Sequence, residues 1–250
     1  MGKIGLFIPC YVDQFYPRVG LATLRILRGL GLEVEYPREQ TCCGQPQYNT
    51  GCSQEARPLA ERFVRMFEGY EAVVAPSASC VSMVRCHYPD LLGGSDAVRA
   101  LGERTYELTE YLVDVAKVTR VDGEYARKVG LHRSCHGIRE LRMSRSSERM
   151  DPPFDKTRQL VSQLRGIELV ELERPDECCG FGGTFAVTEE AVPCMMGRDR
   201  IADHVRAGAE VIAGYDMSCL MHMEGLARRD GNRIPVVHVA EMLEKARLSR

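Results

Sequence analysis

Long hydrophobic runs are absent from this sequence of 250 residues. Its longest apolar stretches, residues 4–8 and 72–75, are far shorter than the roughly 20 residues that a membrane-spanning helix needs. An export signal is also missing, because a single Lys3 precedes a short run that ends at Pro9 and Cys10. Leu6 stands where a myristoylation signal requires Ser or Thr. We therefore expect a soluble, cytoplasmic protein without membrane insertion.

An excess of one charge is lacking as well. The formal net charge is -2, from 33 basic and 35 acidic residues, and the basic residues are scattered along the chain. Proteins that bind a phosphate backbone gather their basic residues into a patch or stripe. We therefore expect no nucleic acid partner.

Cysteine, in contrast, is abundant. Eleven cysteines in a chain without an export signal, and an odd number of them, do not suit a complete set of disulfides. In a reducing compartment such residues are more often metal ligands or redox-active thiols.

Eight of these cysteines occur in two copies of one pattern. Each copy has a single cysteine after an apolar run, a Cys-Cys-Gly block, and another single cysteine after a second apolar run. The intervals are 31 and 36 residues in the first copy and 42 and 39 in the second. The repeated cysteines are Cys10, Cys42, Cys43 and Cys80, then Cys135, Cys178, Cys179 and Cys219. Order is kept while loop lengths change, which indicates an internal duplication.

The local patterns predict alternating strands and helices. Short apolar runs before the single cysteines are typical of buried strands, while residues 19–30, 54–67 and 198–206 have helical spacing. This alternation predicts an α/β fold of two pseudo-symmetric halves, each a mostly parallel sheet flanked by helices. Ligands of such sheets bind beyond the carboxyl ends of the strands, where the single cysteines fall.

The expected boundary between the halves lies near residue 122. It divides the chain into a first cysteine-rich repeat, residues 1–122, and a second, residues 123–250. We expect a helix over residues 106–118 that belongs to neither repeat.

The Cys-Cys-Gly blocks favour a polynuclear metal centre. Adjacent Cα atoms are only about 3.8 Å apart, so two neighbouring thiolates reach a compact cluster more easily than two corners of one tetrahedron. Gly44 and Gly180 follow the cysteine pairs and permit a tight turn with positive φ. Soft thiolates select iron–sulfur clusters, zinc or Cu(I), and four thiolates per half satisfy one cluster.

These motifs resemble a known duplicated cysteine-rich domain, found in heterodisulfide reductase and in the iron–sulfur subunits of glycolate and glycerol-3-phosphate oxidation. Four segments resemble the lactate utilisation protein A family more closely. They are Pro76-Ser77-Ala78-Ser79-Cys80, Ser134-Cys135-His136, Glu177-Cys178-Cys179-Gly180-Phe181-Gly182-Gly183 and Met217-Ser218-Cys219-Leu220-Met221-His222.

The resemblance implies a subunit of an oxidoreductase that oxidises L-lactate to pyruvate. It implies electron transfer through iron–sulfur clusters, one [4Fe-4S] cluster per half, held by the eight repeated cysteines. The implied partners are companion lactate-utilisation subunits, including a ferredoxin-like iron–sulfur protein. No flavin or nicotinamide motif is present, so L-lactate as the substrate follows from the resemblance alone.

The chain departs from these relatives at one position of each repeat. The heterodisulfide reductase relatives end each repeat in Cys-x-x-Cys, and five cysteines are implied to bind a noncubane cluster. Here Met83 and His222 replace the last cysteine. His222, three residues after Cys219, is therefore a candidate extra ligand or an ordinary histidine.

Zinc is the alternative metal. Three cysteines with His222 would make a Cys₃His zinc set in the second half, and the protein would then be a structural or docking module without redox activity. The three remaining cysteines have no counterpart in the other half and are expected in packing: Cys52, Cys86 and Cys194.

Overall fold

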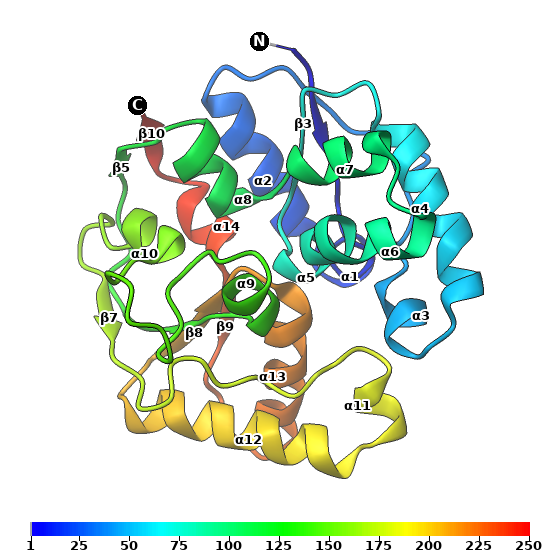
Figure 1. Cartoon of the computed structure of the whole chain (residues 1–250). Coiled ribbons are helices and arrows are strands. Elements are labelled where there is room, and N and C mark those ends of the chain that lie inside the picture. The colour runs from blue at the N-terminus through cyan, green and yellow to red at the C-terminus, as the bar shows by residue number, and fades with distance from the viewer. Residues whose placement is uncertain (1) are drawn as a thin grey trace.

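The computed structural model describes residues 2–250 and shows an α/β protein with two four-stranded parallel sheets (Figure 1). Its first half contains two π-helical turns, η1 and η2, besides helices and strands. The elements of the first half are β1 (Ile4–Leu6), α1 (Cys10–Phe15), α2 (Pro17–Gly29), β2 (Val34–Glu35), α3 (Gln45–Asn49), α4 (Ser53–Phe67), β3 (Ala72–Ala75), α5 (Ala78–Ser82), η1 (Met83–His87), α6 (Tyr88–Leu92), α7 (Asp96–Glu103), β4 (Thr105–Glu107), α8 (Leu108–Glu110), η2 (Tyr111–Val115) and β5 (Arg120–Asp122).

The second half repeats this alternation with fewer helices. Its elements are β6 (Lys128–His132), α9 (Cys135–Arg139), α10 (Lys156–Val161), β7 (Glu168–Val170), α11 (Phe185–Thr188), α12 (Ala191–Arg206), β8 (Val211–Gly214), α13 (Met217–Arg229), β9 (Val236–His238), α14 (Val239–Leu243) and β10 (Arg247–Ser249).

The two sheets have the same topology. Their strand orders are β2-β1-β3-β4 and β7-β6-β8-β9, with parallel pairing throughout. Ile4 pairs with Ala72 in the first sheet, and Val129 pairs with Val211 in the second. The central strands β3 and β8 are fully buried, as expected for parallel strands covered on both faces. The predicted fold class and its two related halves are confirmed.

The helix expected over residues 106–118 is wrong in part. Residues 105–107 form β4, the fourth strand of the first sheet, and only the following residues are helical. This segment also has a counterpart, because β9 and α14 follow the second repeat in the same way. A strand of three residues is too short to show a period of two, so the apolar residues that follow it dominated the pattern.

Each half extends a short helix onto the other. The C-terminal α14 contacts α2 of the first half, and α8 contacts α10 of the second. In Figure 1 the red α14 lies beside the blue α2. A small antiparallel pair, β5 with β10, joins the chain's end to the segment between the sheets. The division at residue 122 stays a prediction, with one four-stranded sheet on either side of it.

The helices that carry the single cysteines meet where the halves touch. Helix α5 contacts α9, and α1 contacts α13. Ser77 and Asp216, which are the N-cap residues of α5 and α13, form an isolated antiparallel bridge. The carboxyl ends of the two sheets therefore face a common region. Among residues 2–250 there is no helix with the length and apolar character needed to cross a membrane.

A buried acid, Glu107, caps α8 at this junction. Its carboxylate accepts hydrogen bonds from the backbone N–H of Thr109 at 2.6 Å and of Glu110 at 3.3 Å. Burial raises the pKa of Glu107 to about 8. A raised carboxyl pKa stabilises the fold at low pH, and this contribution is lost as the pH rises from about 4.5 to about 8.

The substitution Glu107→Gln is therefore expected to remove part of the pH dependence of stability. Relative to the wild type, the variant should gain a few kcal/mol in unfolding free energy between about pH 5 and pH 8, since glutamine does not ionise. Urea unfolding at a series of pH values measures this difference. A difference that does not change with pH would show that Glu107 does not titrate in this range.

Candidate metal centre

All eight repeated cysteines line one cavity between the halves. The cavity has a volume of about 100 Å³, which is room for several water-sized atoms. Its other polar lining residues include Gln45, His136 and Asp216. The folding of the chain therefore brings the two cysteine groups to a common space rather than to remote parts of the molecule.

In the first half, the cysteine sulfurs converge from three segments. Cys10 begins α1, Cys42 and Cys43 lie in the loop before α3, and Cys80 lies in α5. The Sγ atoms of Cys10 and Cys42 are 3.7 Å apart. Cys43 and Cys80 are buried. The hydroxyl of Tyr88 donates a 2.9 Å hydrogen bond to the carbonyl of Cys43, which fixes the backbone of the cysteine pair.

The second half repeats this arrangement. Cys135 begins α9, Cys178 and Cys179 lie in the loop before α11, and Cys219 lies in α13. The Sγ atoms of Cys135 and Cys178 are 3.9 Å apart. Cys179 and Cys219 are buried. The same positions are therefore close together and buried in both halves.

The thiols of each group have unequal acidity. Hydrogen bonds from Cys10 and Cys43 lower the pKa of Cys42 to about 3, and the equivalent bonds from Cys135 and Cys179 lower the pKa of Cys178 to about 2. The hydrogen bond to Cys42 raises the pKa of Cys10. Neighbouring S–H donors thus stabilise one thiolate in each group. The negative charge of that thiolate disfavours ionisation of the other thiols close to it.

The glycine after each cysteine pair turns the backbone with positive φ. Gly44 has φ 84° and Gly180 has φ 87°. The N–H of Gly44 points at the Cys42 sulfur at 3.4 Å, and the N–H of Gly180 points at the Cys178 sulfur at 3.3 Å. These contacts favour the thiolate form. The expected role of both glycines in turning the chain is confirmed.

The two glycines differ in the space around them, and this difference predicts unequal costs of substitution. A Cβ on Gly180 would lie 2.6 Å from Cβ of Met196, whereas one on Gly44 would lie 3.3 Å from the carbonyl of Ala56. Gly180→Ala is expected to lower stability by about 1–3 kcal/mol, and Gly44→Ala by less. Thermal unfolding of both variants measures the difference, and equal losses would contradict the steric argument.

Asp216 holds the two halves together at the cavity. Its buried carboxylate accepts a 2.8 Å hydrogen bond from the backbone N–H of Ser79 in the first half. The hydroxyl of Ser218 in the second half donates to it at 2.7 Å. The rings of Tyr11 and Phe181, one from each half, also meet at the cavity with centroids 5.8 Å apart.

The other sequence candidates lie elsewhere. His222 is on α13, and its Nε2 is 3.0 Å from the carbonyl of Pro193, so its role as a ligand stays a prediction. Cys52 and Cys86 are exposed, so their expected place in packing is wrong, while Cys194 is partly buried.

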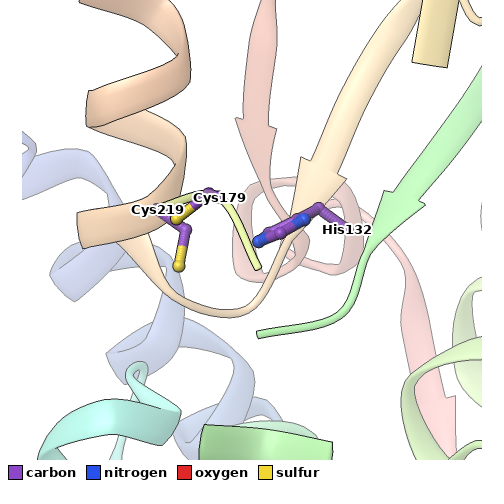
Figure 2. A group of neighbouring side chains, drawn as sticks. All are labelled: His132, Cys179 and Cys219. Carbon is purple, nitrogen blue, oxygen red and sulfur yellow. The ribbon is translucent and has the colours of Figure 1, made fainter. Parts of the chain in front are cut away.

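The sequence patterns missed a second kind of residue beside the second cysteine group. Ligand atoms of His132, Cys179 and Cys219 all lie within 4.8 Å of one another (Figure 2). Buried Arg200 and His204 lie next to His132. His132, which directly follows the buried run Val129-Gly130-Leu131 in β6, was the available signal.

Sequence comparison defines the class of protein. The family described as "Cysteine-rich domain" matches residues 4–85 and 129–224, one match in each half and more than half of the chain together. The chain is therefore a protein with two cysteine-rich domains.

Closer relatives define the particular family. The chain is 40% identical over 245 residues to the Lactate utilization protein A of Macrococcus caseolyticus, covering 96% of each chain. It is 38% identical over 247 residues to the Lactate utilization protein A 2 of Bacillus cereus strain AH820, covering 97% of this chain and 98% of the relative. The protein belongs to the Lactate utilization protein A family, which confirms the resemblance seen in its motifs.

A solved structure shares the fold at low sequence identity. A hypothetical protein from Helicobacter pylori matches with a TM-score of 0.60 at 10% identity, covering 97% of this chain and 49% of the other. The chain thus spans about half the length of that protein. This likeness supports the α/β architecture alone.

Proposed function

We propose that the chain is an iron–sulfur electron-transfer subunit of an oxidoreductase that oxidises L-lactate to pyruvate in lactate utilisation. The observation that carries the proposal is the gathering of eight repeated cysteines around one cavity. Relatives named for lactate utilisation, nearly as long as this chain, support the metabolic role. Companion subunits, including a ferredoxin-like iron–sulfur protein, would exchange electrons with it.

The donor set fits iron–sulfur clusters. Four sulfurs per half are the usual number of ligands for one cluster, and thiolates are the preferred donors. Cys10, Cys42, Cys43 and Cys80 would hold the first cluster, and Cys135, Cys178, Cys179 and Cys219 the second. Bound clusters would supply one-electron transfer.

The chain's own residues would orient the ligands and limit water. The N–H groups of Gly44 and Gly180 hold the sulfurs of Cys42 and Cys178. The crossed rings of Tyr11 and Phe181 are apolar cover for the cavity between the two groups. Hydrogen bonds to sulfur and restricted solvent are two of the features by which proteins tune a cluster's potential.

Anaerobic purification with reconstitution tests this proposal. Iron and acid-labile sulfide are expected in equal amounts in the wild type, with brown colour that bleaches on reduction. Cys43→Ser should lose the iron and sulfide bound by the first half, and Cys179→Ser should lose those bound by the second half. Absence of iron and sulfide from reconstituted wild type would overturn the proposal.

The lactate step is tested separately, because the chain alone is not expected to oxidise lactate. When this chain is mixed with its purified companion subunits, adding L-lactate should reduce the clusters of this chain. The chain without companions, and the complete set with D-lactate, are the controls. Cluster reduction by the isolated chain and L-lactate would show that the companions are not required.

Zinc is a second candidate, favoured by the sulfur separations. Zinc–sulfur bonds of about 2.3 Å place two sulfurs of one tetrahedral ion about 3.8 Å apart, and the observed separations are 3.7 Å and 3.9 Å. The protein would then be a colourless structural or docking module. The same metal analysis distinguishes the two candidates, because the zinc module would contain zinc and neither iron nor sulfide.

A further inference from the structure

The two cysteine groups are not chemically equivalent, because the strand beside each one ends differently. Phe7 and His132 both precede the first single cysteine of their repeat by three residues. The strand registers support this equivalence, since β1 and β6 pair in the same way with β3 and β8. The second half therefore has an imidazole where the first has a phenyl ring.

The helix packed on each strand differs in the same way. Phe7 contacts Phe63 and Phe67 of α4, with ring centroids 4.9 Å and 5.9 Å away. His132 lies 6.3 Å from His204 of α12. A Cβ on Gly5 would meet Phe67, as one on Gly130 would meet His204. An aromatic cluster in the first half thus corresponds to a polar one in the second.

His132 is buried without a hydrogen-bond partner. Its side chain is 2% exposed, and neither ring nitrogen makes a hydrogen bond to any of residues 2–250. A buried polar group without a partner destabilises the fold, and a bound metal would offset this cost. Figure 2 shows the imidazole directed toward Cys179 and Cys219.

We propose that His132 is a nitrogen ligand of the metal centre held by Cys135, Cys178, Cys179 and Cys219. The proposal rests on the proposed function for the presence of metal there. It makes the second centre a sulfur and nitrogen site, while the first, with Phe7, has sulfur donors alone. Neutral imidazole adds no negative charge, unlike the fifth thiolate that the heterodisulfide reductase relatives are implied to have.

The side chain of His132 suits this role. A neutral imidazole has a free lone pair on one nitrogen, and neither ring nitrogen of His132 is engaged in a hydrogen bond to residues 2–250. His222 differs, because its Nε2 lies 3.0 Å from the carbonyl of Pro193. That contact uses Nε2 as a donor, and neither ring nitrogen of His222 belongs to the group of ligand atoms that lie within 4.8 Å of one another among residues 2–250.

Pulsed electron paramagnetic resonance on protein labelled with ¹⁵N-histidine tests the proposal. Reconstituted, reduced wild type is expected to show a hyperfine coupling from a directly bound histidine nitrogen. His132→Phe, which installs the residue of the first repeat, and His132→Ala should lose this coupling. Metal affinity of the second site should fall about tenfold or more, because removing a ligand should cost at least as much as removing a residue that only orients one.

Two histidines near the same cysteines are matched controls. His222→Gln and His136→Gln should keep the coupling; His136 has Nδ1 at 3.7 Å from the Cys135 sulfur. Bound iron without histidine coupling, or coupling that survives in both His132 variants, would overturn the proposal and leave the proposed function intact.

Failure of the iron–sulfur function is a distinct result. If the wild type binds zinc and no iron, zinc-edge X-ray absorption tests whether a histidine nitrogen is bound to the metal. A nitrogen neighbour that disappears in His132→Phe supports the proposal, and an all-sulfur signal in the wild type refutes it. Far-ultraviolet circular dichroism of each variant confirms that the fold is kept; a misfolded His132→Phe is replaced by His132→Gln in the same comparison.

Discussion

Replacing Arg200 with methionine is expected to lower the free energy of unfolding by about 3–5 kcal/mol, the usual cost of removing one partner of a buried ion pair. Arg200 is fully buried, and its guanidinium lies 3.1 Å from the carboxylate of buried Asp203. It also donates a hydrogen bond to the carbonyl of Arg174. Methionine keeps much of the volume but removes the buried cation of Asp203, which is left with only the more distant and exposed Arg206 at 3.8 Å.

The same substitution is expected to loosen the second cysteine group. Asp203 accepts hydrogen bonds from the backbone N–H groups of Glu173 and Arg174, at 3.2 Å and 3.1 Å. These residues lead into the loop that contains Cys178 and Cys179. Arg200 and Asp203 therefore position that loop, and metal content of the second half should fall with stability.

Arg198→Met on the same helix is the matched control. Arg198 forms an ion pair with Asp230 on the surface, at 2.6 Å, with both side chains well exposed. Exposed pairs of this kind contribute little, so stability and metal content should stay near the wild-type values. Denaturant unfolding and metal analysis measure both variants. Equal effects of the two substitutions would show that burial of Arg200 has no special consequence.

Metal loading is expected to stabilise the fold and to release protons. A ligand that binds only the folded state at 1,000 times its dissociation constant stabilises by about 4 kcal/mol. Neighbouring sulfurs and burial raise the pKa values of Cys10, Cys43, Cys135 and Cys179, so these groups are protonated thiols near neutral pH. A metal must displace their protons, and its affinity should therefore fall as the pH is lowered.

Calorimetric titration in buffers of different ionisation enthalpy measures the protons released, and thermal unfolding of apo and loaded protein measures the stabilisation. Cys42→Ser should abolish the proton release and the stabilisation that come from the first half, and Cys178→Ser those that come from the second half. Cys52→Ser and Cys86→Ser replace exposed cysteines outside the cavity and should change neither quantity. Stability that does not change on metal loading, or metal binding without proton release, would contradict the conclusion that metal displaces protons from these cysteine thiols.

The elements that the sequence predicted best were those with strong local patterns. The apolar runs ending before Cys10 and Cys135 and the helical spacing of residues 54–67 correspond to β1, β6 and α4. Weak local signals failed, as at β4, where three residues pair with β3 in the interior of the fold. Pairing partners, rather than residue preferences, make so short a segment a strand.

The sequence by itself determined the duplication, the parallel α/β class and the eight repeated cysteines, because repeats and periodicity are properties of order along the chain. Only the tertiary structure decided that both groups line one cavity and that His132, Arg200 and His204 replace an aromatic cluster of the first half. Those neighbours come from segments tens of residues apart, and their contacts depend on how helices pack on the sheets and on each other.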